Sequence, residues 1–537
     1  MTLRRRFHGW PALVAMLAAP AWAEPPPNMR HSPLNVPALH GTLNLSLENA
    51  IEMGLENNLD IQVERYAPFI AAQVEREAWG AYDPDWFGNF SYGKDKSFVT
   101  SQLSASGGAI NELETTRGDT GFRGMIPWLG ATYETKLDTG EGETNLTFQS
   151  LSPQYQSIVS IEGRVPLLKN LIWNEPWTRV KTTRVGAEAS NESFRTEVMD
   201  TVQRIADGYW NLIAAHDQVR VAEKSLETAV ALLSQTKTQH EVGVVSKVEV
   251  VEAEAGVAAR EFDLIVAENR YRNAQDQLID VVLGPHLAAD STLEIEPTDR
   301  PEDYVKYEID AELATERAFE SRPELVVANK EIERSEINLK FAKNQRLPQV
   351  DFVGSYNYAG VSGQDSPVAG TPSPNPDLVG DYGHSYNNFF SSSGPNTFTV
   401  GAAVSFPIGN TAARSRASQA QIELRRSLTR KRRLEQSIIL EVRKAVRDLK
   451  SAQEGIEAAE RRTVAASEQL RAEEIRLEYG ESTPFDVLLR DRDRVDAESQ
   501  EIVAFQTYRT SATGLDRAQG TILRSHNIEI DQVRQLR

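Results

Sequence analysis

An internal duplication constrains the fold more than any other feature of this sequence. One set of matches keeps a constant spacing: Ala50 with Ala314, Asp60 with Glu324, Pro84 with Pro348 and Tyr92 with Tyr356. A second set keeps a shorter constant spacing: Leu212 with Leu449, Ala222 with Ala459, Leu233 with Leu470 and Gly243 with Gly480. Repeats of this kind indicate that one structural unit occurs twice. We therefore expect a mixed α and β, internally duplicated fold, each half reading helix, strand, polar loop, strand, very long helix, tight turn, helix.

Long helices follow from the periodicity of both halves. Residues 178–241 contain no proline, and leucine, valine and alanine recur there at alternating spacings of three and four. This spacing is typical of a coiled-coil seam, and a matching seam runs from Leu449 to Leu470. The high density of charge places these helices in water and not in lipid. We expect antiparallel helices at about 174–241 and 247–283, and again at about 412–479 and 485–519.

Strands are indicated where apolar and polar residues alternate, as in Phe398–Phe406. The pattern predicts four strands per chain, at about 84–93, 157–166, 350–359 and 397–407. Residues 93–121 and 360–396 are polar and are expected to be loops, and residues 122–138 a further hairpin at the outer rim. Such strands suit an outer-membrane barrel, although a half-buried sheet of a soluble protein fits equally well. Tryptophans and tyrosines at the strand ends fit an interfacial belt: Trp79, Tyr82, Trp86, Trp173 and Trp177.

Composition excludes several functions. The formal net charge is −19, so a general nucleic-acid binder is not expected. The mean hydropathy of −0.43 excludes a polytopic helical membrane protein. The chain has no cysteine, and its histidines are scattered. Since we find no motif for phosphate binding, nucleophilic catalysis or metal ligation, we expect no enzyme, no cofactor and no metal site.

The N-terminus predicts export from a bacterial cytoplasm. Arg4–Arg6 form a basic region, Leu13–Ala19 a short apolar region and Ala21–Ala23 a small-x-small cleavage site. These three parts in order are typical of a signal peptide, here residues 1–23. A flexible, proline-rich segment is expected at 24–42. Without a cysteine, the mature protein cannot be a lipoprotein.

Strand counting makes an oligomer necessary if the chain spans a membrane. Four strands cannot close a barrel, and lipid tolerates no open sheet edge. Two copies would give eight strands, whose interior side chains fill, whereas three copies give twelve and leave a passage.

These features together resemble the TolC family of outer-membrane efflux proteins over about residues 43–520. The Gly243 turn and the turn from Gly480 to Asp486 are similar to the two periplasmic tips of that family, and residues 162–168 and 406–408 to its strand-to-helix junctions. The resemblance implies a homotrimer with a twelve-stranded barrel in outer-membrane lipid, continuous with a periplasmic helical tunnel. It also implies two partners, a periplasmic membrane-fusion adaptor and an inner-membrane pump, and no catalysis.

Site residues follow from the same resemblance. Two segments would dock the adaptor: Val242, Gly243 and Val244, and Tyr479, Gly480 and Glu481. Asp486 matches an aspartate that lines the periplasmic gate, and Glu249 is its counterpart in the first half. Three copies of Asp486 would form an acidic ring that selects cations. An equally simple interpretation of Asp486 is a solvated residue at a helix start, favoured by the helix dipole.

A second acidic ring is in doubt, because Leu489 occupies the position of a further family aspartate. Asp491 or Asp493 could replace it only if the helix were rotated.

The expected organisation has two repeats, 43–284 and 312–520, separated by an equatorial linker at 285–311 and followed by a C-terminal tail at 521–537. Two functional hypotheses remain. The first is the outer-membrane exit duct of a tripartite efflux or type I secretion system. The alternative is a soluble periplasmic coiled-coil adaptor or scaffold, although no adaptor-type module is evident in the sequence.

Overall fold

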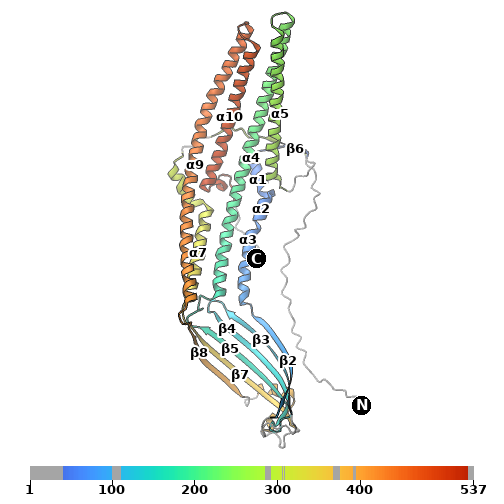
Figure 1. The fold of residues 1–537 in the computed structure, drawn as a ribbon, viewed down its shortest axis with the longest axis vertical. Coiled ribbons are helices and arrows are strands. Elements are labelled where there is room, and N and C mark those ends of the chain that lie inside the picture. The colour runs from blue at the N-terminus through green and yellow to red at the C-terminus, as the bar shows by residue number, and fades with distance from the viewer. Residues whose placement is uncertain are drawn as a thin grey trace, which may run out of the picture.

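The computed structural model describes residues 40–99, 110–284, 292–304, 306, 309–366, 375–390 and 395–529. The molecule is elongated, with a sheet at one end and pairs of long helices that extend away from it (Figure 1). The expected signal peptide and most of the proline-rich segment lie outside the described residues.

The elements of the first half begin with β1 and end with α5. They are β1 (His40–Leu45), α1 (Leu47–Asn57), α2 (Leu59–Glu64), α3 (Tyr66–Trp79), β2 (Asp85–Phe98), β3 (Ile110–Ile126), β4 (Ala131–Thr144), β5 (Leu151–Pro166), α4 (Glu175–Glu241) and α5 (Lys247–Leu283). The second half contains β6 (Thr292–Pro297), α6 (Ala311–Ser321), α7 (Pro323–Asn344), β7 (Gln349–Asp365), α8 (Tyr382–Phe390), β8 (Asn396–Ser405), α9 (Thr411–Glu478), α10 (Pro484–Gln519) and α11 (Ile522–Ser525).

Two helices dominate the molecule. α4 has 67 residues and α9 has 68, so each is about 100 Å long at 1.5 Å per residue. Near the sheet the helices pack side by side in the order α3, α4, α7, α9, and farther away in the order α5, α4, α10, α9 (Figure 1). Within the described residues, no helix combines the length and the apolar character that crossing a membrane requires.

Packing along the helices follows the predicted seams. Leu212 and Ala229 of α4 are buried, as are Leu449 and Ile456 of α9. Small residues at alternate seam positions allow the helices to approach closely. Outside these seams, α5 also approaches α10 closely, because a Cβ at Gly256 would lie 2.7 Å from Cδ1 of Leu488.

The largest apolar core lies midway along the helices, where α1, α4 and α5 meet. There β1 pairs in parallel with β6, far away in the sequence. The Asp299 carboxylate accepts a hydrogen bond from the Leu47 N–H (2.7 Å) and lies 2.6 Å from the Tyr209 hydroxyl. Residues 40–42 therefore belong to a strand, although the sequence predicts a flexible segment there, because only the distant strand β6 supplies their partner.

The sheet has six strands in the order β2-β3-β4-β5-β7-β8, all antiparallel neighbours. The prediction of four strands per chain is therefore wrong. β3 and β4 arise from the segments expected to be a polar loop and a rim hairpin. Between Glu112 and Thr120, β3 carries charged residues, threonine and glycine on both faces, so the apolar alternation that indicates a strand is missing. Pairing with β2 on one side and β4 on the other forms this strand instead.

The turn between β3 and β4 lies at the helical end of the sheet, so its predicted place at the outer rim is also wrong. The Asn174 side chain, at the start of α4, donates a hydrogen bond to the Pro127 carbonyl (3.0 Å). Gly130 has φ +66°, and a Cβ there would lie 2.6 Å from the Asn170 carbonyl oxygen. Glycine is required at this turn both for its conformation and for the close approach.

The segment 360–396, expected to be a loop, contains the end of β7 and the helix α8. α8 packs on β5 and β7, where the Ser385 and Ser157 hydroxyls are 2.9 Å apart and the Tyr155 and Tyr382 rings 5.2 Å apart. A Cβ at Gly360 would lie 1.9 Å from the Ser385 carbonyl oxygen. The glycines and serines that give this segment a loop-like composition thus allow a helix to lie directly on the sheet.

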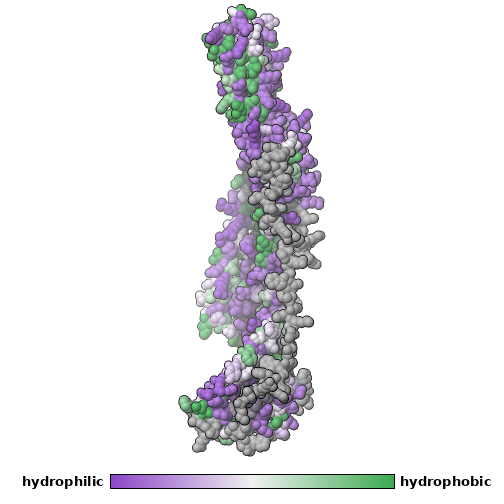
Figure 2. Space-filling view, turned by 90° about the vertical axis from the view of Figure 1, so that its right-hand side faces the viewer, coloured by the Kyte–Doolittle hydropathy of each residue, from purple (hydrophilic) through white to green (hydrophobic). Residues whose placement is uncertain are grey.

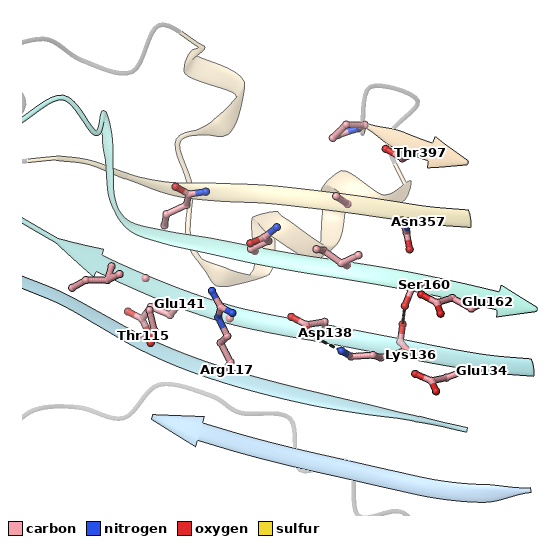
Figure 3. A pocket seen from close by; sticks show the side chains of 18 of the residues that line it. Thr115, Arg117, Glu134, Lys136, Asp138, Glu141, Ser160, Glu162, Asn357 and Thr397 are labelled. Carbon is pink, nitrogen blue, oxygen red and sulfur yellow. Dashed lines mark hydrogen bonds and ion pairs between the residues drawn. The ribbon is translucent and has the colours of Figure 1, made fainter. Parts of the chain in front are cut away.

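The two faces of the sheet differ in polarity. Strand register aligns one row across all six strands: Trp86, Phe122, Thr135, Ile161, Tyr356 and Phe398. The adjacent row on the opposite face is Phe87, Gly121, Lys136, Ser160, Asn357 and Thr397. The second face forms a hollow lined by Arg117, Lys136, Asp138 and other polar side chains (Figure 3). One face is thus rich in apolar and aromatic side chains, and the other is largely polar.

Each end of the apolar face is marked by a distinct group of side chains. At the helical end, the Trp79 ring lies 5.5 Å from that of Trp177, and the Lys181 ammonium 3.9 Å from the centre of the Trp173 ring. At the far end, Lys94 and Lys96 form ion pairs with Glu112, at 3.6 and 2.6 Å. These ion pairs interrupt the apolar face near the far ends of β2 and β3, where only Phe98 and Ile110 follow them.

Candidate functional site

The first candidate docking tip is the turn between α4 and α5. Gly243 has φ +79°, the left-handed conformation that glycine adopts without strain. Its N–H donates to the His240 carbonyl (2.9 Å), and the Val244 N–H donates to the Gln239 carbonyl (2.8 Å). This pair of bonds is a Schellman motif, which ends a helix by satisfying its last carbonyls.

The second candidate tip, between α9 and α10, repeats that geometry. Gly480 has φ +75°, and its N–H donates to the Leu477 carbonyl (3.0 Å). The Glu481 N–H donates to the Arg476 carbonyl (2.8 Å). The same Schellman motif therefore ends both long helices, which explains why glycine occupies both positions.

Apolar side chains are exposed at both tips. Val242 and Val244 are 70% and 72% exposed, and Tyr479 is 80% exposed. Phe485, six residues after Tyr479 and across the same turn, is also exposed. Figure 2 shows hydrophobic side chains gathered at this helical end of the molecule. Exposed apolar groups at the ends of otherwise charged helices indicate a contact surface.

Glu249 and Asp486 occupy equivalent places beyond the two turns, each the third residue of its helix. Ser246 accepts a hydrogen bond from the Glu249 N–H (3.4 Å) and begins α5. At α10, Thr483 accepts from the Asp486 N–H (3.3 Å), and the Asp486 carboxylate accepts from the Thr483 N–H (3.4 Å) and hydroxyl (2.7 Å). Asp486 therefore completes a capping box and also gains from the helix dipole.

The two alternative acidic positions have different surroundings. Asp491 is fully buried, and its carboxylate accepts from the Ser225 hydroxyl of α4 (2.6 Å) and from Arg494 (2.9 Å). Asp493 is half exposed and pairs with Arg490 at 3.2 Å. Asp491 therefore joins α10 to α4 and is not free to line an open passage.

The Asp491 cluster is the part of this site that the sequence analysis missed. Arg260 of α5 approaches Asp491 to 3.9 Å, so three helices meet at one carboxylate. No sequence signal identifies such a cluster, because its members come from distant segments. The capping residues Ser246 and Thr483 could have been recognised, since each precedes an acidic residue by three positions.

A second buried ionic cluster lies nearer the sheet and joins four helices. Arg517 of α10 donates to Asp200 of α4 (2.5 Å) and to Glu324 of α7 (2.9 Å), and Arg322 pairs with Glu441 of α9 at 2.7 Å. Burial alone would raise the pKa of Glu324, but the two arginines outweigh it and lower the pKa to about 2. Among the described residues, no group of three or more His, Asp or Glu side chains is placed to hold a metal ion.

Comparison with known proteins agrees with this architecture. The family model described as outer membrane efflux protein matches residues 126–282 and 314–521, more than half of the chain. The chain is 22% identical over 384 residues to outer membrane protein TolC of Vibrio cholerae serotype O1, and the match covers 70% of this chain and 80% of that protein.

Solved structures of outer-membrane channels share the fold. CusC superposes with a TM-score of 0.63 at 14% identity, covering 89% of this chain and 92% of that one. OprN gives 0.62 at 16% identity, covering 88% and 90%. The open state of MtrE from Neisseria gonorrhoeae gives 0.59 at 15% identity, covering 89% of each chain. Together with the family match, which confirms the TolC-family resemblance, this places the chain in the outer membrane efflux protein family.

Proposed function

We propose that this protein is the outer-membrane exit duct of a tripartite efflux or type I secretion system. It passively conducts substrates from a periplasmic adaptor and an inner-membrane pump to the outside. One observation carries this proposal. The sheet, the helices near the sheet and the distal helices each form a single layer with two unpaired edges, and these edges lie on the same two sides of the molecule.

Each level of the molecule ends in one element from the first half and one from the second. The sheet ends at β2 and β8, the helices near the sheet at α3 and α9, and the distal helices at α5 and α9. An unpaired sheet edge calls for a partner strand, above all in lipid. Contact between two different edges of identical copies is head-to-tail, and it forms a ring when the rotation from one copy to the next closes.

Strand direction supports the same closure. β2 leaves the helices and β8 returns to them, so β8 of one copy can continue the antiparallel sheet by pairing with β2 of the next. In a homotrimer, which the family resemblance implies, the sheets would form one barrel and the rows of helices one continuous tunnel.

The two faces of the sheet support its insertion into lipid. An outer-membrane barrel turns its apolar face to lipid and its polar face to the passage. Phe398, Val400 and Val404 of the apolar face are 63–74% exposed in the single chain. A soluble adaptor or scaffold, the alternative hypothesis, would leave this surface in water, which favours the duct.

We assign adaptor docking and gating to the helical end of the molecule, opposite the sheet. The exposed valines and Tyr479 at the two turns offer an apolar surface to the adaptor, and three copies of Asp486 form an acidic constriction with Glu249 nearby. The predicted signal peptide, residues 1–23, accounts for export to the outer membrane, and the lack of cysteine for a mature protein without a lipid anchor.

The test is single-channel conductance of the detergent-extracted protein in a planar bilayer. Asp486→Asn removes the charge but keeps an oxygen for the capping bonds, and Asp493→Asn is the matched control on the same helix. We expect small, cation-selective steps whose selectivity falls in Asp486→Asn and not in the control. Steps unaffected by Asp486→Asn would contradict the gate assignment, and a protein that forms no channels would contradict the duct itself.

A further inference from the structure

The number of strands in the sheet of one chain, six, bears on the size of the proposed barrel. We infer that three copies of this chain close into an eighteen-stranded barrel in which the β3–β4 hairpin is part of the wall, giving the barrel the same circumference as the helical tunnel. This inference rests on the proposed trimeric duct, and differs from the twelve strands that the family resemblance implies.

The widths of the two layers of a single chain carry the argument. Four helices packed side by side, at about 9–10 Å between axes, cover an arc of about 38 Å. Strands lie about 4.8 Å apart, and a tilt of about 40° increases this to about 6 Å around the circumference. Six strands then cover about 37 Å, whereas four would cover only about 25 Å. Six strands per chain thus match the four helices to which they are joined.

The side chains of β3 and β4 have the two-faced pattern of a barrel wall. Phe122 and Leu137 lie on the face that also carries Trp86 and Ile161. Asp138 and its ion-pair partner Lys136 (3.2 Å) lie on the opposite, polar face (Figure 3). A hairpin outside the membrane would be in water on both faces, and we would not expect it to continue the apolar face of its neighbours.

Pairing also fixes the hairpin inside the sheet. β3 pairs with β2 from Asp85↔Arg123 to Phe98↔Ile110, over the whole length of β2. β4 pairs with β5 along most of its length. At Gly121 a Cβ would lie 2.1 Å from the Thr135 carbonyl oxygen, so β3 and β4 approach as closely as glycine permits. Removing the hairpin from the wall would separate β2 from the rest of the sheet.

A barrel of eighteen strands changes which part of the duct is narrowest. Barrel diameter grows roughly linearly with strand number, so eighteen strands give a mouth about one and a half times as wide as twelve. Because barrel and tunnel have equal circumference, the passage does not taper at the membrane. The largest solute that can pass is therefore set at the periplasmic tips.

Two neighbouring positions in β4 test whether the hairpin lines the passage. The chain has no cysteine, so Leu137→Cys and Asp138→Cys each introduce a single thiol. A charged thiol reagent that does not enter lipid is added to open channels in a bilayer. We expect stepwise conductance changes with Asp138→Cys and none with its matched control Leu137→Cys. Equal reaction of both thiols, or reaction of Leu137→Cys alone, would overturn the inference.

A second measurement tests the width. A variant without Ile110–Thr144 loses both strands but keeps β2 leading away from the helices and β5 returning. Polymers of graded size, added from the outer side, should enter the complete barrel up to a larger size than they enter this variant. Equal exclusion sizes would contradict the eighteen-stranded wall. If the variant does not insert, the thiol pair still decides, and a complete chain that forms no channels would instead contradict the proposed duct.

Discussion

At the scale of single residues, the buried carboxylate of Asp491 joins three helices, α4, α5 and α10. We expect Asp491→Ala to lower the free energy of unfolding by about 3 kcal/mol, because breaking a buried ion pair leaves the buried Arg494 guanidinium without one of its partners. Urea unfolding followed by circular dichroism measures this. Asp493→Ala, the exposed control, should cost less than about 1 kcal/mol. Similar costs for the two variants would contradict a larger contribution of the buried cluster to stability.

Asp207 of α4 should make stability depend on pH. Burial raises the pKa of its carboxyl to about 6, although a hydrogen bond from Gln203 opposes the shift, and within the described structure Oδ1 has no hydrogen-bond partner. The unfolded pKa is about 3.9. Between about pH 4 and pH 6 the folded state therefore binds the proton more tightly, so stability falls as pH rises through this window and stays lower above it.

Asp207→Asn should therefore raise the free energy of unfolding at pH 7 by up to about 2 kcal/mol and flatten its change between pH 4 and pH 6. Glu324→Gln is the opposite control. The depressed pKa of Glu324 gives stability that is present above about pH 4.3 and lost as pH falls through about 2. Unfolding curves at pH 4.5 and pH 7 measure the Asp207 effect, and curves at pH 4.5 and about pH 2 measure the Glu324 effect. An unchanged pH dependence in Asp207→Asn would refute the assignment.

At the scale of elements, the two helical hairpins depend on the conformation of their turns. We expect Gly243→Ala to cost about 1 kcal/mol locally, because an L-residue is strained at positive φ even though the space around Gly243 is open. Hydrogen exchange should accelerate around residues 240–248 and not in the rest of α4. Gly455→Ala, in open space within α9 and without positive φ, should be neutral or stabilising. Faster exchange in that control would mean that loss of glycine itself, and not the turn geometry, is responsible.

The elements differ in how far the sequence predicts them. The seam residues of α4 and α9 predict long helices because a heptad pattern depends only on local spacing. β3 and the strand β1 are not predictable in this way, since each is formed by pairing with distant segments. For the candidate site, the turn glycines are visible in the sequence, but the burial of Asp491 is not, because Ser225 and Arg260 reach it from other helices.

At the scale of the whole molecule, ring closure should depend on the open side of α5. Phe262 and Ile265 lie on this edge helix and are 66% and 63% exposed in the single chain. Phe262→Glu combined with Ile265→Glu should abolish the proposed trimer and leave the helix content unchanged, since neither side chain is buried within one copy. Light scattering in detergent measures the mass. Phe148→Glu, at an equally exposed loop position away from the edges, should remain trimeric.

The far end of the sheet has a consequence for molecules that approach the cell from outside. β3 has 17 residues, so it is about 55 Å long and rises about 40 Å at the usual tilt, while an apolar barrel band is only about 25 Å tall. The parts of β2 and β3 that extend beyond this band carry the ion pairs of Lys94 and Lys96 with Glu112 on what would be the outward face of the barrel. The cell would therefore display a rigid, hydrogen-bonded collar, and antibodies raised against the folded protein should lose this epitope when the chain is denatured.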